Sequence, residues 1–199
     1  MSEHQLTTRG IVLLAIVGGI ITANAYYIHP IIGRVAESFG VSDGAIGVVP
    51  ALNQIALALG VLLLLPLGDR MSNRRLAVIC LSMQVLALVT MALVQNFYWF
   101  VAASTLLGFF TVTPYLLPTY ASKRVDTRHL GFVTAVLTTG IVAGVQVSRI
   151  SSGVVGEYLG WRFVYWIAAI LMIAATIILP MLMKESPQQT AATQPSYPQ

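Results

Sequence analysis

The chain has 199 residues, of which 57% are hydrophobic and 9% are charged, and its formal net charge is +4. So few polar side chains cannot cover a water-soluble domain of this size, and most of the surface is expected to face lipid. The basic residues are not gathered on one soluble face, which argues against nucleic acid as a partner. The single cysteine, Cys80, excludes a disulfide framework.

Six apolar runs of about 20 residues follow one another, and each is long enough to cross a bilayer. They are expected to be helices, because hydrocarbon offers an unpaired backbone no hydrogen-bonding partner. We therefore predict an all-α membrane protein with six transmembrane helices. The predicted spans are Ile11–Pro30, Gly44–Leu67, Leu76–Gln95, Tyr98–Tyr120, Leu130–Gly156 and Phe163–Met183.

These spans form one predicted domain over residues 11–183. Residues 1–10 precede it as a cytoplasmic N-terminus. Residues 184–199 are rich in Gln, Thr, Ala and Pro and lack apolar periodicity. Such a composition predicts a disordered tail or the start of a linker.

The basic residues separate between alternate turns. If the N-terminus is cytoplasmic, the outer turns hold only Arg34 and Arg162. The cytoplasmic segments then hold Arg9, Arg70, Arg74, Arg75, Lys123, Arg124, Arg128 and Lys184. This positive-inside pattern predicts that both termini lie in the cytoplasm.

The first span contains Ala23-Asn24-Ala25, a small-x-small sequence that a signal peptidase could cleave. An uncleaved helix is the favoured interpretation, because the apolar stretch continues past this point into Tyr26 and Tyr27. Cleavage would leave the orientation of the other five spans unchanged, so the charge bias does not decide between the two interpretations.

Two short motifs occur once in each half of the helical region. Tyr-x-x-Pro occurs at residues 27–30 and 115–118, and Leu-Gly-x-Arg occurs at residues 67–70 and 159–162. Because three spans separate the copies, the second copy crosses the membrane in the opposite direction. The pattern therefore predicts an inverted three-plus-three repeat, as found within one half of many secondary transporters.

The turn over residues 65–75 reads Leu-Pro-Leu-Gly-Asp-Arg-Met-Ser-Asn-Arg-Arg. It resembles the signature loop between the second and third helices of the major facilitator superfamily, Gly-x-x-x-Asp-Arg-x-Gly-Arg-Arg/Lys. The matching residues are Asp69, Arg70, Arg74 and Arg75, and the departures are Leu65, Ser72 and Asn73. The resemblance implies that the matching residues latch this side to the other transporter half, through contacts between charges and helix ends. The alternative is a charged loop that only anchors topology.

Small residues recur at four-residue spacing in the fifth span, at Gly140, Gly144, Ser148, Ser152 and Gly156. Such a flat face predicts close helix packing in lipid. The segment also resembles the antiporter signature of the same superfamily, Gly-x-x-x-Gly-Pro-x-x-Gly-Gly. Arg149 stands where that signature has proline, so packing is favoured over a specific antiport role.

Arg149 is the strongest candidate for a substrate-binding residue. An arginine at the centre of a span costs about 2.5–3.5 kcal/mol of insertion free energy, so it usually faces protein or water. We predict that it faces a central cavity and attracts an anionic group of a substrate. The alternative is snorkelling towards Glu157 or lipid phosphates. The predicted substrate-binding residues are Asn24, Tyr27, Asn53, Gln54, Tyr115, Gln146 and Arg149.

Proton coupling has little support in the sequence. No Asp or Glu lies deep in a span, and Ser104 stands where many antiporters of the superfamily carry an arginine. His29 is predicted at the outer end of its span and His129 in a cytoplasmic turn, both solvated. Aromatic residues at span ends are predicted to form a headgroup-level belt: Tyr26, Tyr27, Tyr98, Trp99, Tyr158, Trp161 and Trp166.

The resemblance extends to about Met183 and corresponds to the first six helices of a twelve-helix transporter. Residues 25–30 and 66–70 look most like bacterial efflux permeases of drugs, sugars or related metabolites, which implies a place in the inner membrane and a small-molecule substrate. In such proteins the substrate lies between two six-helix halves. The chain supplies one half, so the predicted partner is a missing C-terminal half, another chain or a second copy in a homodimer, and truncation is favoured.

Other functional classes fit the sequence less well. A rhomboid-like protease needs a nucleophilic serine facing a deep histidine, and neither His29 nor His129 is predicted at that depth. A channel would show paired half-helices or a ring of charges. No enzyme activity, cofactor or metal is expected. A six-helix scaffold or subunit that does not transport is the alternative to a transporter.

Overall fold

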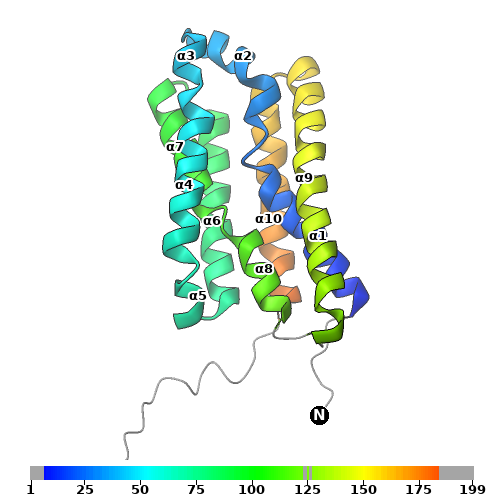
Figure 1. The fold of residues 1–199 in the computed structure, drawn as a ribbon. Coiled ribbons are helices and arrows are strands. Elements are labelled where there is room, and N and C mark those ends of the chain that lie inside the picture. The colour runs from blue at the N-terminus through cyan, green and yellow to red at the C-terminus, as the bar shows by residue number, and fades with distance from the viewer. Residues whose placement is uncertain (1–6, 123–124, 126, 184–199) are drawn as a thin grey trace, which may run out of the picture.

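The computed structural model describes residues 7–122, 125 and 127–183, without the side chains of Asp69, Ser122 and Thr127. The predictions made for Lys123, Arg124 and the tail over residues 184–199 concern positions outside the described residues. The structure is a bundle of helices (Figure 1). In chain order the helices are α1 Thr8–Ala23, α2 Ile28–Phe39, α3 Asp43–Ile46, α4 Val48–Leu64, α5 Leu67–Arg70, α6 Asn73–Leu93, α7 Phe97–Phe110, α8 Thr113–Ser122, α9 Leu130–Tyr158 and α10 Trp161–Leu182, with a 3₁₀ turn at Thr127–His129.

The prediction of six membrane spans is confirmed for the described part of the chain. The spans are Thr8–Phe39, Asp43–Leu64, Asn73–Leu93, Phe97–Ala121, Leu130–Tyr158 and Trp161–Leu182. The first and last described residues, the α5 turn and the α8–α9 turn lie at one end of the bundle (Figure 1). Apart from Arg149, which lies within the fifth span, the described basic residues therefore divide between the two ends as the charge pattern requires.

The predicted end of the first span at Pro30 is wrong, because the helix continues as α2 to Phe39. Pro30 lies in the first turn of α2, where a proline ring is tolerated. The helix stops at Gly40, whose φ of +65° gives the left-handed cap that glycine adopts without strain. His29 therefore lies inside the span and is half-buried, which corrects the prediction of a solvated histidine at its end.

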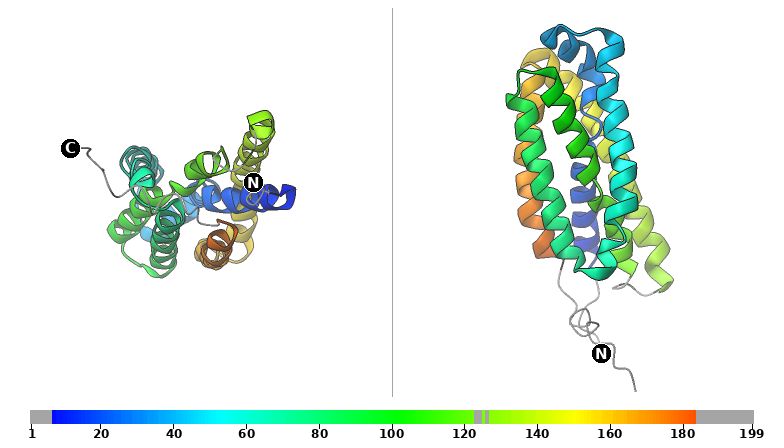
Figure 2. Two further views of the ribbon diagram at one scale, coloured as in Figure 1. Left: turned by 90° about the horizontal axis from the view of Figure 1, so that it is seen from below. Right: turned by 90° about the vertical axis from the view of Figure 1, so that its left-hand side faces the viewer.

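The helix pairs follow the predicted inverted repeat. In each three-span unit, the first span packs against the second span of the other unit: α1 lies on α9, and α7 lies on α4. The third spans, α6 and α10, pack on each other. Seen along the bundle, α4, α6 and α7 group on one side, and α9 lies at the edge of the other (Figure 2). The reciprocal pairing confirms a six-helix half built from two units of opposite orientation.

Glycines allow two of these crossings to be close. A Cβ atom on Gly19 would lie 2.5 Å from the carbonyl oxygen of Gly140, and one on Gly144 would lie 2.5 Å from the Cα atom of Gly19. At the second crossing, a Cβ atom on Gly108 would lie 2.9 Å from the carbonyl carbon of Asn53. Backbone atoms cannot move aside as a flexible side chain can, so each crossing requires glycine.

Aromatic side chains close the end of the bundle where α9 turns into α10. Phe100 packs edge-on against Trp161 and Tyr165, with ring centroids 5.5 Å and 5.7 Å away. Trp161 is 6% exposed, so its predicted place in a headgroup-level belt is wrong. The guanidinium of Arg162 lies 4.1 Å from the Trp161 ring centroid and donates to the Val94 carbonyl at 3.1 Å. The cation therefore covers this aromatic cluster.

Candidate functional site

The first span is interrupted at residues 24–27, between α1 and α2. In this break the backbone N–H groups of Asn24, Ala25 and Tyr26 each bond to the carbonyl three residues earlier, as in a 3₁₀ turn. Pro30 has no N–H to offer the Tyr26 carbonyl, which instead lies 3.1 Å from His29 Nδ1. Tyr26 and Tyr27 thus lie in the middle of the span, and the belt predicted for them is wrong.

The fourth span is interrupted at the corresponding place, at residues 111–112 between α7 and α8. Pro114 has no N–H with which to bond the Phe110 carbonyl four residues earlier. That carbonyl accepts a hydrogen bond of 2.9 Å from Gln84 Nε2 of α6. Both interruptions therefore remove the usual helical donor of a mid-span carbonyl. The His29 backbone N–H replaces it at Tyr26, at 3.4 Å, and the Gln84 side chain replaces it at Phe110.

Gln84 connects the two interruptions. Its side chain is fully buried, and its Oε1 accepts from Asn24 Nδ2 and from Thr111 Oγ1, each at 3.4 Å. One amide therefore bonds both broken spans. The sequence patterns did not point to Gln84, although a lone glutamine halfway along an apolar span is a usable signal, because a polar group in lipid needs a partner.

The seven predicted substrate-binding residues do not come together in one place. Asn24 and Asn53 are 4% and 2% exposed and bind neighbouring helices. Asn53 Nδ2 donates to the Ser104 carbonyl at 2.7 Å, joining α4 to α7. Gln54 lies half-buried on α4, and Gln146 is exposed on α9. The two asparagines therefore join helices within the bundle.

Arg149 belongs to a cluster that spans three segments. Its guanidinium carbon lies 5.6 Å from the centroid of the Tyr26 ring, a cation–π contact. The His29 ring stacks on the same tyrosine at 5.7 Å. Tyr115 of α8 is exposed. The sequence assigned Tyr26 to the belt because the break that brings it inward was not foreseen.

The snorkelling alternative named Glu157 as a partner of Arg149. In the structure, Glu157 forms an ion pair with Arg34, joining the end of α9 to α2. The side chain of Arg149 is exposed on α9. It lies nine residues before the end of that helix, about 14 Å along the axis. The midpoint of α9 is Gly144, five residues or about 8 Å from Arg149. Half of the hydrocarbon core is about 15 Å, so Arg149 lies within the apolar part of the span.

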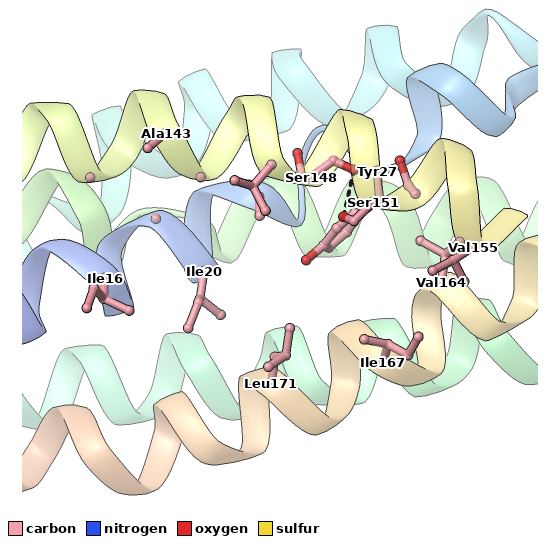
Figure 3. A pocket seen from close by; sticks show the side chains of 16 residues that line it. Ile16, Ile20, Tyr27, Ala143, Ser148, Ser151, Val155, Val164, Ile167 and Leu171 are labelled. Carbon is pink, nitrogen blue, oxygen red and sulfur yellow. Dashed lines mark hydrogen bonds between the residues drawn. The ribbon is translucent and has the colours of Figure 1, made fainter.

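Tyr27 points elsewhere, into a groove of about 430 Å³ between α1, α9 and α10. Figure 3 shows its side chain among the residues that line this groove. The lining is largely aliphatic, and the small-residue stripe of α9 supplies part of it, at Gly140, Gly144, Ser148 and Ser152. The rest of that stripe lies against α2, since a Cβ atom on Gly156 would overlap Ile31.

The signature loop forms the short helix α5 and the start of α6. Ser72 caps α6 by accepting from the Arg75 N–H at 3.3 Å. Arg70, Arg74 and Arg75 are exposed at this end of the bundle, and the side chain of Asp69 lies outside the description. A second cavity, of about 470 Å³, lies beside α5 between α4 and α8. Among the described residues, no cluster of three His, Cys, Asp or Glu side chains could hold a metal ion.

Comparison with known proteins gives consistent matches. The profile of the family described as "Major Facilitator Superfamily" matches residues 14–196 of the chain. The uncharacterized transporter YgaY of Escherichia coli O157:H7 is 30% identical over 99% of the chain and 49% of its own length. The "Probable transporter SCO4007" of Streptomyces coelicolor is 30% identical over 85% of the chain and 40% of its own length.

A third relative, the MFS-type transporter YbcL of Bacillus subtilis, is 25% identical over 85% of the chain and 44% of its own length. The chain thus spans about half the length of these relatives, or somewhat less than half. Fold, repeat and profile agree that it is a multi-pass membrane protein. The chain belongs to the Major Facilitator Superfamily, a family of transporters.

Proposed function

We propose that the chain is the N-terminal half of a secondary transporter that moves a small molecule bearing an anionic group, in the efflux direction, across a bacterial inner membrane. The single observation that carries the proposal is an arginine within the apolar part of a membrane span, held against Tyr26 and exposed on α9. An arginine at such a depth is expensive unless it faces water, protein or a ligand. A substrate anion supplies the missing partner.

The surface of α9 supports a crevice on the side of Arg149. Only 11% of its most apolar stretch is buried, the lowest share of the six spans. Gln146 and Arg149 are three residues apart and share one exposed face. Polar faces on spanning helices point to protein or water rather than lipid. The second half of the transporter would close this crevice, and Tyr26 and Tyr115 would add rings and hydroxyls to it.

The signature loop supports the same arrangement. The exposed arginines at residues 70, 74 and 75 lie at the end of the bundle that holds the described termini. By the positive-inside rule, this charge distribution favours a cytoplasmic location for that end. We propose that they and Asp69 latch the second half on this side. The partner is a C-terminal half on the same or another chain, with a homodimer as the competing arrangement, and size determination in detergent separates these cases.

A ligand-dependent shift in melting temperature tests the proposed anion site on the chain itself. The chain in detergent is heated with benzoate, gluconate or glutamate, and with the uncharged benzamide and glucose. We expect at least one anion to raise the melting temperature, because a ligand that binds only the folded state stabilises it. The shift is lost in Arg149→Gln and kept in Arg9→Gln, an exposed arginine at the start of α1. A shift in Arg149→Gln equal to that of the wild type would refute the proposed anion site.

A flux assay in proteoliposomes tests transport separately. Anion binding without flux by the chain alone is expected if a second half is required. Flux restored by adding that half, and abolished by Arg149→Gln, identifies a carrier. Binding without flux in the complete assembly would instead favour the scaffold alternative.

A further inference from the structure

The groove between α1, α9 and α10 has no role in the proposed crevice. Exposed aliphatic side chains form its rim: Ile16 is 53% exposed, Val147 is 63% and Ile167 is 41%. Figure 3 shows Ile16, Ile20, Ile167 and Leu171 facing the space between α1 and α10. All three helices belong to membrane spans. The groove therefore opens within the apolar, lipid-facing part of the surface.

The two faces of α9 separate this groove from the site of Arg149. Val147, Ile150 and Val154 are exposed and follow the spacing of one helical stripe. With 3.6 residues per turn, Arg149 points away from that stripe, whereas Gln146, four residues before Ile150, lies at its border. An apolar stripe is expected to face lipid, so the groove opens to the bilayer and the arginine to the crevice.

The polar groups in the groove favour an apolar occupant. The Ser148 hydroxyl donates to the Val145 carbonyl at 2.7 Å, and the Ser151 hydroxyl to the Ser148 carbonyl at 3.2 Å. The Ser152 hydroxyl donates to the Arg149 carbonyl at 3.4 Å. With these protons used within α9, a water molecule would find few of the two to four partners that it needs. An aliphatic chain leaves these three serine hydroxyls with their acceptors.

The groove is held open by backbone packing. The contact between Gly19 and Gly144 fixes α1 against α9, and α10 packs on both. The lining runs from Gly140 to Val155 on α9, about 22 Å, and from Val164 to Leu171 on α10, about 10 Å. One leaflet of hydrocarbon is about 15 Å deep. The groove therefore has the length of a single extended chain.

We propose that this groove binds one acyl chain of a bilayer phospholipid, with the head group at the end where α9 turns into α10. The lipid is the occupant because the rim is continuous with the lipid-facing surface of α9 and α10. A bound chain would also brace α10 against α1. The proposal is independent of transport and can be tested on the chain alone.

The test is the number of phospholipids that the chain retains when it is released from nanodiscs of phosphatidylethanolamine and phosphatidylglycerol into native mass spectrometry. Ser151→Phe fills the groove, whereas Val154→Phe adds the same side chain on the exposed stripe of α9. We expect the wild type and Val154→Phe to retain one phospholipid more than Ser151→Phe. A second pair, Ile167→Trp in the lining and Ile170→Trp outside it, repeats the comparison on α10.

Variants that unfold are recognised by the loss of a cooperative melting transition. If a variant of the first pair unfolds, the comparison of Ile167→Trp with Ile170→Trp tests the proposal. Equal lipid retention in the lining and control variants overturns the proposal. So does a wild type that carries no phospholipid, or one whose groove-dependent adduct has the mass of another small molecule, which would identify a ligand site instead.

Discussion

Replacing Gln84 by leucine removes the side chain that bonds both interrupted spans. Phe110 loses the donor at 2.9 Å from its carbonyl, and Asn24 loses the acceptor of its amide N–H. The Asn24 Oδ1 atom already has no partner among the described residues. Thr111 keeps its bond of 2.7 Å to the Leu107 carbonyl. Two buried polar groups are therefore orphaned.

The expected loss of stability is about 2 kcal/mol. A buried group left without its partner costs about 1–3 kcal/mol, whereas hydrogen bonds between spanning helices average about 0.6 kcal/mol. The long Asn24 contact falls at the low end. The Phe110 carbonyl falls at the high end, because Pro114 prevents the helix from satisfying it.

Equilibrium unfolding of the chain in dodecyl maltoside micelles, titrated with sodium dodecyl sulfate, measures this difference. Gln146→Leu is the matched control, because Gln146 is exposed on α9, and its change is expected within about 0.5 kcal/mol. A Gln84→Leu variant as stable as Gln146→Leu would refute the assignment of Gln84 as the link between the interruptions.

Two further substitutions test the packing and the capping. Gly144→Ala places a Cβ atom against the Gly19 backbone and should destabilise by about 1–3 kcal/mol. In the same unfolding assay Gly153→Ala, whose nearest neighbour would be 3.5 Å away, should be neutral or stabilising by up to about 1 kcal/mol. Ser72→Ala removes the cap of α6 and should cost about 1 kcal/mol, whereas the exposed Ser82→Ala should not. Equal effects within either pair would contradict the assigned contact.

The six spans and the inverted repeat were predictable, because both leave marks on the sequence that lipid enforces. An apolar run of span length has few other uses, and the repeated Tyr-x-x-Pro motif begins at the end of the interruption in the first unit and shortly after it in the second. The end of the first span was not predictable from its apolar run. Pro30 looked like a terminator, yet a proline in the first turn of a helix is compatible with its continuation.

The candidate site was harder to predict, because residue type does not reveal which face of a helix a residue occupies. Asn24 and Asn53 looked like amides for a substrate, and both bind neighbouring helices. Tyr26 was assigned to the membrane interface and instead contacts Arg149 in mid-span. The assignments of Asn24 and Tyr26 depend on where α1 breaks, and hydrophobicity does not encode that position.

The most direct test of the central claim is the side of the membrane on which each end of α6 lies. In a Cys80→Ala background, single cysteines replace Arg74 in its first turn and Gln95 just past its end, both exposed. These positions are about 32 Å apart along the axis, the thickness of the hydrocarbon core. An impermeant maleimide added to intact spheroplasts should label Gln95→Cys and reach Arg74→Cys only after permeabilisation. Labelling of both from outside would contradict the six-span arrangement.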